Sequence, residues 1–362
     1  MPDCCYRCFK HPWLKRLIDE SATKLGTCGF CGSREVALSD VGNVRDPLLN
    51  VVSLYTALTG DALLPWENPI EIGDTLEHLL QEDWDLFSDA LIDSGQVLDL
   101  IHAIDISGWE KDSGEDLIDT NELYIRPRNL YQLTPNEAWD QFRNEVRGNP
   151  DADPDLRFAV EDDLFRGEKR IPKGTELFRA RPGCHSDDSG INKPYVDGDI
   201  GAPPVGKARP ARLSRQGEVL LYCADQETTA VAEIRPWRGL IVTMARFRAR
   251  NDLRILDLSS YLPGPNPFTT EYLSYEIEIT HLLNGFADDL SLPLERPDDE
   301  FGYLPSQKLA DIIRAADFDG VRYKSAMQPN GANVALFDPA EMEFVESKLV
   351  RVTSVSIESV NE

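Results

Sequence analysis

Short apolar runs separated by polar turns dominate the C-terminal half of the chain. The run 219–224 has the length of a buried strand, and Asp225 follows it at a position that favours helix initiation. This pattern predicts a strand that leads directly into a helix beginning near Gln226, which Pro236 ends. Glu233 lies among the apolar residues of this helix without a lysine neighbour at helical spacing, so its carboxylate is a candidate functional group.

Further strands and one more helix are predicted around this stretch. The predicted strands cover residues 176–181, 240–247, 252–258, 320–324 and 334–337. A helix with the apolar stripe Leu309, Ile312, Ile313 and Ala316 is expected to begin near Pro305, with Ser306 as its cap. Residues 185–217 are rich in Gly, Pro and Asp, and their length indicates either a lid over a pocket or a solvated loop.

The N-terminal half has a helical pattern. Apolar residues recur at helical spacing from about 47 to 106, and a capping box at 134–137 predicts a helix that ends at Gly148. The polar run 148–154 has the composition of a linker. The sequence therefore predicts three domains: a small ribbon at 1–40, an acidic helical domain at 41–150 and an α+β domain at 151–362.

Four cysteines in the predicted ribbon have the spacing of a zinc site. Cys5 and Cys8 form one C-x2-C pair, and Cys28 and Cys31 form a second. Two such pairs hold one tetrahedral zinc ion in many small domains, so structural zinc is expected here. Cys4 is a spare ligand and His11 a competing one, and unrelated reduced thiols are the alternative interpretation. Clusters of Lys and Arg in the ribbon are nearly cancelled by acids, which favours a structural role over phosphate binding.

The net charge of −26 argues against general nucleic-acid binding, because phosphate contacts depend on clustered cations. No Lys or Arg occurs between Asp46 and Glu110, whereas residues 166–254 contain many, and an anionic dinucleotide would be attracted to that region. No apolar run has the ~18 residues that a membrane helix requires. The N-terminal residues lack the order of a secretory signal, so a cytoplasmic location is expected.

Three blocks carry a resemblance to a known family. They are Leu-Phe-Arg-Ala-Arg at 177–181, Leu-Tyr-Cys-Ala at 221–224 with Ala-Val-Ala-Glu-Ile-Arg at 230–235, and Phe-Asp-Gly-Val-Arg-Tyr-Lys-Ser at 318–325 with Gly-Ala-Asn at 331–333. The C-terminal half thereby resembles the RES-domain family, named for its Arg, Glu and Ser, which here are Arg179, Glu233 and Ser325. The resemblance implies the toxin half of a toxin-antitoxin pair, with an antitoxin or other regulatory protein as partner. It also implies an α+β fold related to ADP-ribosyltransferases that binds and destroys NAD+.

The resemblance, together with residue chemistry, assigns roles in the proposed site. Glu233 would stabilise the oxocarbenium-like ribosyl cation that forms when the nicotinamide bond breaks, by analogy with glycoside hydrolysis. Alternation along the strand 176–181 places Arg179 and Arg181 on one face, where they would clamp the phosphates. The remaining expected substrate contacts are Tyr222, Ser325, Asn333 and, near a helix N-terminus, Gln307. For the arginines and for Glu233 the alternative interpretation is ion pairing at the surface.

The sequence leaves the reaction open between hydrolysis, phosphorolysis and ADP-ribosylation of a macromolecule. A non-enzymatic regulator that senses the nucleotide is a further alternative. The helical region resembles HEPN domains, some of which cut RNA with an Arg followed closely by His. His78 and His102 are preceded by no arginine, which argues against a ribonuclease.

Overall fold

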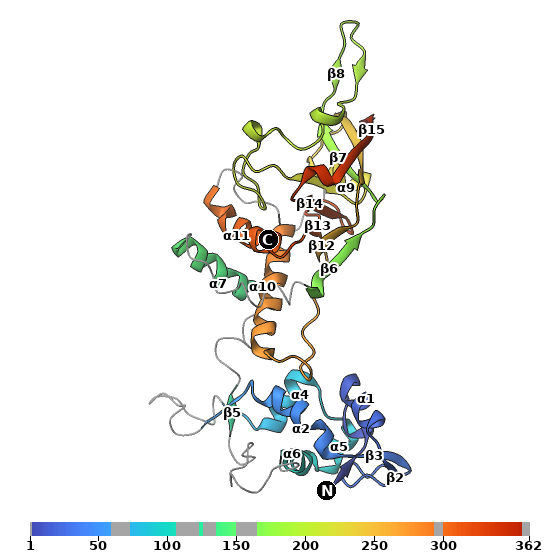
Figure 1. Ribbon diagram of the computed structural model, residues 1–362, viewed down its shortest axis with the longest axis vertical. Coiled ribbons are helices and arrows are strands. Elements are labelled where there is room, and N and C mark those ends of the chain that lie inside the picture. Colours follow the sequence, from blue (N-terminus) through green and yellow to red (C-terminus); the bar gives the residue numbers. More distant parts are fainter. Residues whose placement is uncertain are drawn as a thin grey trace. The chain divides into compact units, whose positions relative to one another are not determined.

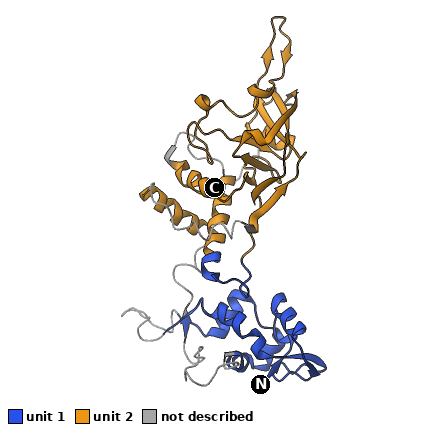
Figure 2. Ribbon diagram, in the orientation of Figure 1, with its two compact units in different colours: residues 1–132, 265–277 blue, residues 133–264, 278–362 orange. Residues whose placement is uncertain are grey.

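The computed structural model describes residues 2–58, 73–105, 123–125, 135–149, 165–292 and 300–356. The chain forms two compact units (Figures 1 and 2). Unit 1 contains residues 1–132 and 265–277, and unit 2 contains residues 133–264 and 278–362. No helix among the described residues is long and apolar enough to cross a membrane.

Unit 1 combines a small sheet with short helices. Its three-stranded antiparallel sheet has the order β1 (Asp3–Cys4), β3 (Val36–Asp40), β2 (Lys24–Gly26). Its helices are α1 (Pro12–Glu20), α2 (Arg45–Val52), α4 (Leu76–Trp84), α5 (Asp89–Ser94) and α6 (Val97–Asp105). The strands β4 (Thr56–Ala57) and β5 (Tyr124–Ile125) pair with each other. The described part of the predicted helical domain 41–150 is therefore mainly helical but also contains strands.

One hydrophobic core runs through unit 1. Phe9 and Leu14 from the predicted ribbon pack in the same cluster as Leu80 and Phe87 from the predicted helical domain. Phe268, which comes far later in the sequence, joins them and stacks on Trp13 with ring centroids 5.3 Å apart. The described side chains on the two sides of the predicted boundary near residue 40 thus share one core. The boundary itself stays a prediction.

Unit 2 is built on an eight-stranded sheet with the order β15-β11-β7-β10-β14-β13-β12-β6. The strands are β6 (Glu168–Ile171), β7 (Glu176–Pro182), β10 (Leu221–Ala224), β11 (Ile241–Ala249), β12 (Leu253–Leu258), β13 (Gly320–Lys324), β14 (Ala332–Leu336) and β15 (Met342–Arg351). Only the β12–β13 pair is parallel, and the other described neighbours are antiparallel. Both sheet edges, β15 and β6, thus lie away from β10 and β14 at its centre.

The helices of unit 2 fall into two groups. The short helix α9 (Glu227–Glu233) packs against β7 and β10. The helices α7 (Pro135–Gly148), α10 (Leu273–Ser291) and α11 (Leu304–Ala315) lie together beside the sheet (Figure 1). Trp139 of α7 contacts Phe286 of α10 with ring centroids 5.2 Å apart. The helix α10 also supplies residues 273–277 to unit 1.

Two predicted helix caps are wrong. The helix α9 is capped by Gln226, since the carboxylate of Asp225 is occupied by the Ala332 amide at 3.1 Å and by Arg322 at 3.2 Å. The helix α11 begins at Leu304 with Tyr303 as its cap, and the Ser306 hydroxyl donates backwards to the Tyr303 carbonyl at 2.9 Å. In both cases a tertiary or local hydrogen bond competes with capping for the same side chain.

The segment 185–217 is neither a plain loop nor fully solvated. It contains the small hairpin β8 (His185–Ser186) and β9 (Asn192–Lys193), followed by 3-10 turns at Asp197–Asp199 and Val205–Lys207. Ile200 is buried in the same cluster as the sheet residues, and Ser214 is also buried. Residues 150–154 of the predicted linker and the predicted cap Thr134 lie outside the described residues.

Candidate functional site

A cavity of about 240 Å³ lies where α9 meets the centre of the sheet. Its lining comes from β7, β10, α9, β13 and β14, which are distant in sequence. The residues are Phe178, Arg179, Ala180, Tyr222, Cys223, Ala224, Ala230, Glu233, Ile234, Tyr323 and Asn333. We call it the Glu233 pocket. Sheet register brings these strands together, since Ala224 pairs with both Phe178 and Asn333, and Asn333 pairs with Tyr323.

Glu233 is held by two hydrogen bonds to the same carboxylate oxygen. The Ser325 hydroxyl donates to Oε1 at 2.6 Å, and the Asn333 amide donates to it at 2.7 Å. The Ser325 oxygen accepts the backbone N–H groups of Met327 at 3.1 Å and Gln328 at 3.0 Å, so its proton is directed at Glu233. These bonds fix the carboxylate rotamer and leave Oε2 as the oxygen available to a ligand. Ser325 and Asn333 therefore act as positioning residues for Glu233.

Arg179 is anchored through part of its guanidinium. Its Nε donates to the Ile200 carbonyl at 2.9 Å and its Nη1 to the Tyr222 carbonyl at 2.6 Å. Burial lowers the pKa of this guanidinium. Among the described residues Nη2 makes no hydrogen bond, so it is the part of Arg179 that can meet an anionic ligand.

Two tyrosines give the pocket an aromatic, uncharged lining. Burial raises the pKa of the Tyr222 phenol, whose oxygen lies 3.4 Å from the Ser214 hydroxyl. Burial also raises the pKa of Tyr323. Both phenols are therefore neutral hydrogen-bonding groups at physiological pH. Tyr323 was not among the residues predicted from the sequence, although it stands two positions before Ser325, which places both side chains on one face of an extended segment.

Three predicted contacts do not line this pocket: Ser325, which instead holds Glu233, and Arg181 and Gln307. Arg181 is exposed, donates to the Asp199 carbonyl and lies over the Tyr195 ring at 4.6 Å. Gln307 is buried, and its amide donates to the carbonyls of Ala211 and Ser214, both at 2.9 Å. Gln307 thus supports the loop that carries Ser214 rather than lining the pocket.

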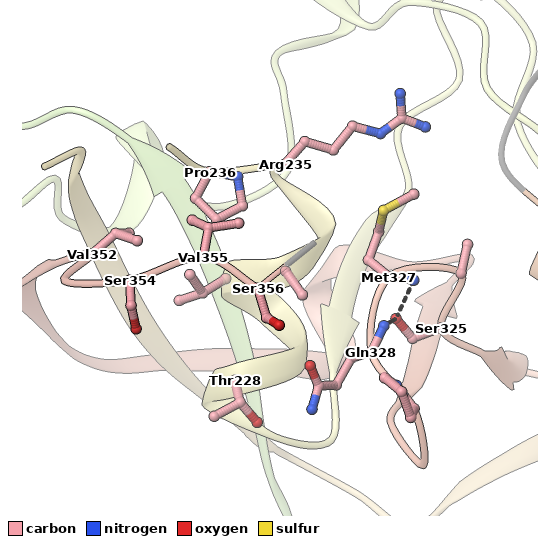
Figure 3. Close-up of a pocket in the computed structure, with 14 residues that line it drawn as sticks. Thr228, Arg235, Pro236, Ser325, Met327, Gln328, Val352, Ser354, Val355 and Ser356 are labelled. Atoms are coloured by element: carbon pink, nitrogen blue, oxygen red, sulfur yellow. Dashed lines mark hydrogen bonds between the residues drawn. The ribbon is translucent and has the colours of Figure 1, made fainter. Parts of the chain in front are cut away.

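A second, larger cavity of about 860 Å³ lies on the other side of α9 (Figure 3). Its walls are the outer face and end of α9, the loop 325–329 and the segment 352–356. The residues are Thr228, Val231, Ala232, Arg235, Pro236, Ser325, Ala326, Met327, Gln328, Pro329, Val352, Ser354, Val355 and Ser356. We call it the α9 cavity. Ser325 lines this cavity, and its hydroxyl donates to Glu233, which lines the Glu233 pocket, so this hydrogen bond links the linings of the two cavities.

The four predicted cysteine ligands come together in unit 1. The sulfurs of Cys5, Cys8, Cys28 and Cys31 all lie within 4.8 Å of one another, and three of these residues are fully buried. Tetrahedral zinc with Zn–S bonds of about 2.3 Å requires sulfurs roughly 3.8 Å apart, so the donor set fits this metal. The hydrogen bonds between these thiols lower the pKa of Cys28 and raise the pKa of Cys5 and Cys8. Gly32, at φ +71°, follows the second pair and allows the chain to turn tightly around the sulfurs.

Unit 2 defines a class of site in which a short helix on a mixed sheet presents a glutamate to a central pocket. Residues 176–357 match the RES domain family, and the chain belongs to that family. Among solved structures, it is similar to a chain in the crystal structure of the M. tuberculosis MbcT-MbcA toxin-antitoxin complex. The identity is 14%, the match covers 53% of this chain and 92% of that chain, and the TM-score is 0.31. No curated protein matches this chain.

Proposed function

We propose that unit 2 binds NAD+ and cleaves its nicotinamide–ribose bond. The observation that carries the proposal is the carboxylate of Glu233, fixed through one oxygen by Ser325 and Asn333 and facing a pocket that also contains Arg179. Membership of the RES family, whose toxins destroy NAD+, supports the same reaction. The proposal includes the relationship to ADP-ribosyltransferases that the family resemblance implies.

The chemistry follows from where the charges lie. Departure of neutral nicotinamide leaves positive charge on the ribose, which becomes oxocarbenium-like. The free Oε2 of Glu233 stabilises this developing charge, and a carboxylate that is already oriented does so without reorganisation. Nη2 of Arg179 holds a phosphate oxygen, while Tyr222 and Tyr323 enclose the planar nicotinamide. The nicotinamide ring carries a positive charge while it is bound to the ribose and leaves as a neutral molecule, so its departure needs no metal. Water, phosphate or a protein side chain then takes the ADP-ribose.

The test is to incubate the purified chain with NAD+ and measure free nicotinamide by chromatography. Glu233→Gln retains the size of the side chain and removes its charge, so the rate of nicotinamide release is expected to fall by about 100- to 1,000-fold. Glu227→Gln on the same helix is the matched control, because Glu227 pairs with Lys348 and does not line the pocket. Unchanged turnover in a folded Glu233→Gln variant would remove this residue from the mechanism.

The same incubation separates the alternatives. Hydrolysis yields ADP-ribose, phosphorolysis requires phosphate and yields a phosphorylated ADP-ribose, and protein modification transfers radiolabel to a macromolecule. NAD+ that binds in calorimetry without release of nicotinamide would indicate a nucleotide-sensing regulator instead.

We also propose that Cys5, Cys8, Cys28 and Cys31 hold one structural zinc ion. The support is the mutual distance and burial of their sulfurs. A structural ion would bind the turn around Cys5 to the turn around Cys28 and so stabilise the first forty residues.

A regulatory partner follows from the family. RES domains are best known as toxins paired with antitoxins, so we propose that a regulatory protein binds this chain in the cytoplasm. Expression of this chain alone should deplete NAD+ in cells. Co-expression with the regulatory protein that binds it should suppress this loss.

A further inference from the structure

We infer that the α9 cavity binds the adenosine-phosphate half of the dinucleotide, with Arg235 as the residue that recognises its phosphate. The inference rests on the proposed function and assigns the part of the substrate that the Glu233 pocket does not hold. It makes Arg235 a specificity-determining residue for dinucleotides over mononucleotides.

The first argument is size. The Glu233 pocket measures about 240 Å³, which is below the roughly 300–1,000 Å³ of cavities that enclose a drug-sized ligand. NAD+ is at least of that size, so the pocket accommodates only the end that carries the scissile bond. The rest of the molecule therefore needs a second site. The neighbouring volume of about 860 Å³ is lined by other residues of α9 and by Ser325, whose hydroxyl donates to Glu233.

The second argument is an unpaired cation. Among the described residues the Arg235 guanidinium makes no hydrogen bond and no ion pair, although the chain carries a net charge of −26. Figure 3 shows its side chain extending from the end of α9 on the same side as Met327 and away from Thr228 and Ser356. A guanidinium in this position can make paired, charge-assisted hydrogen bonds to a phosphate.

The third argument is the backbone at Arg235. Its φ is +47°, in the left-handed region where glycine is favoured, and its N–H closes the helix end by donating to the Ala232 carbonyl at 2.9 Å. An arginine in this conformation carries backbone strain that glycine would not, and strained residues concentrate at functional sites.

The fourth argument is the character of the walls. Val231, Pro236 and Val355 offer apolar surface to a flat base. In Figure 3 the Gln328 amide and the hydroxyls of Thr228 and Ser356 point toward the interior, where they can meet ribose hydroxyls. Apolar walls with a few convergent polar groups are the usual composition of a nucleoside site.

The experiment compares NAD+ with nicotinamide mononucleotide, which has the same scissile bond and lacks the adenosine-phosphate half. Arg235→Ala is expected to raise the KM for NAD+ roughly tenfold, the factor for one lost charge-assisted hydrogen bond, and to leave the KM for the mononucleotide unchanged. The Kd of ADP-ribose, measured by calorimetry, should rise by the same factor. Arg238→Ala is the control, since Arg238 is exposed nearby and does not line the cavity.

A second variant separates binding from folding. Arg235→Gly relieves the left-handed backbone, so its melting temperature should equal or exceed that of the natural chain while ADP-ribose binding weakens. Equal ADP-ribose affinity in either Arg235 variant overturns the inference, as does an equal KM increase for both substrates. If the natural chain releases no nicotinamide at all, the proposed cleavage fails, and the ADP-ribose titrations still decide whether the α9 cavity binds this half.

Discussion

The cysteine cluster of unit 1 and the Glu233 pocket of unit 2 are assembled in different ways. In the cluster, each cysteine pair spans one short turn, and the contacts between pairs join sulfurs 20 to 26 residues apart. In the pocket, the residues that hold Glu233 lie 92 and 100 residues further along the chain. The first arrangement is encoded in local spacing, whereas the second exists only once β13 and β14 have paired with the rest of the sheet.

The two arrangements also differ in what stabilises them. A structural zinc ion contributes on the order of 10 to 16 kcal/mol in comparable peptides, concentrated in four bonds. Glu233 is held by two charge-assisted hydrogen bonds of about 1.5 to 3 kcal/mol each, on strands that the sheet already fixes. Perturbations should therefore have an all-or-none effect in the cluster and a graded effect in the pocket.

The largest effect is expected from Cys28→Ser. Metal analysis of the natural chain should find one zinc ion, which this variant should lose, and hydrogen exchange should show loss of protection in the first forty residues. Cys4→Ser is the control, because Cys4 is buried beside the cluster but is not one of the four sulfurs. Zinc retained in Cys28→Ser, or absent from natural protein purified without chelator, would contradict the zinc proposal.

The next largest effect concerns the residues that position Glu233. Ser325→Ala and Asn333→Ala should each lower kcat/KM for NAD+ by about tenfold to a hundredfold, the factor for one hydrogen bond to a charged group. The double variant should fall by less than the product of the two, because both residues act through one carboxylate. Ser325→Thr should retain much of the activity since it keeps the hydroxyl. Strictly additive losses would indicate separate roles in binding.

A smaller, structural effect is expected from Gly331→Ala. A Cβ at this position would lie 2.3 Å from the Thr229 hydroxyl and 3.1 Å from its Cβ, on a helix that cannot move away without shifting Glu233. The free energy of unfolding should fall by about 1 to 3 kcal/mol in urea titrations, as for other overpacked sites. Gly206→Ala, with nothing within 4 Å of its added Cβ, should leave stability nearly unchanged.

The smallest effect is expected from Arg179→Lys. A lysine keeps the charge but cannot bond the carbonyls of Ile200 and Tyr222 while also meeting a ligand, so NAD+ should bind roughly tenfold more weakly in calorimetry. Arg181→Lys is the comparison, because Arg181 is exposed and contacts Asp199 and Tyr195. If Arg181→Lys weakens binding as much, then the clamp of two arginines predicted from the sequence is correct.

Much of unit 2 was predictable where apolar runs are short and bounded by turns. The strand 320–324 coincides with β13, and the predicted strand before Gln226 differs from β10 only in its first two residues. The edge strand β15 was missed because its residues are mostly half-buried and do not form an apolar run. The 19-residue helix α10 was missed as well. Its residues pack in two units, so no single apolar stripe describes it.

The site residues also differ in whether a local sequence pattern could predict them. The cysteine set follows from spacing alone, and its sulfurs do converge. Arg179, Glu233, Ser325, Tyr222 and Asn333 were found through the family resemblance, since no local pattern links residues so far apart. Gln307 was placed from its position near a helix start, but its amide is bonded to the carbonyls of Ala211 and Ser214 instead. Helix position does not show which buried carbonyls a side chain will meet.

The distance in sequence between Glu233 and Asn333 has a consequence during synthesis. Ribosomes add roughly 5 to 20 residues per second, so about 5 to 20 s pass between the appearance of Glu233 and that of Asn333, 100 residues later. During that interval the carboxylate has been made, but Ser325 and Asn333, which hold it, have not. A nascent chain that already carries Arg179, Tyr222 and α9 is therefore unable to form the proposed site, which becomes complete only when translation has passed β14.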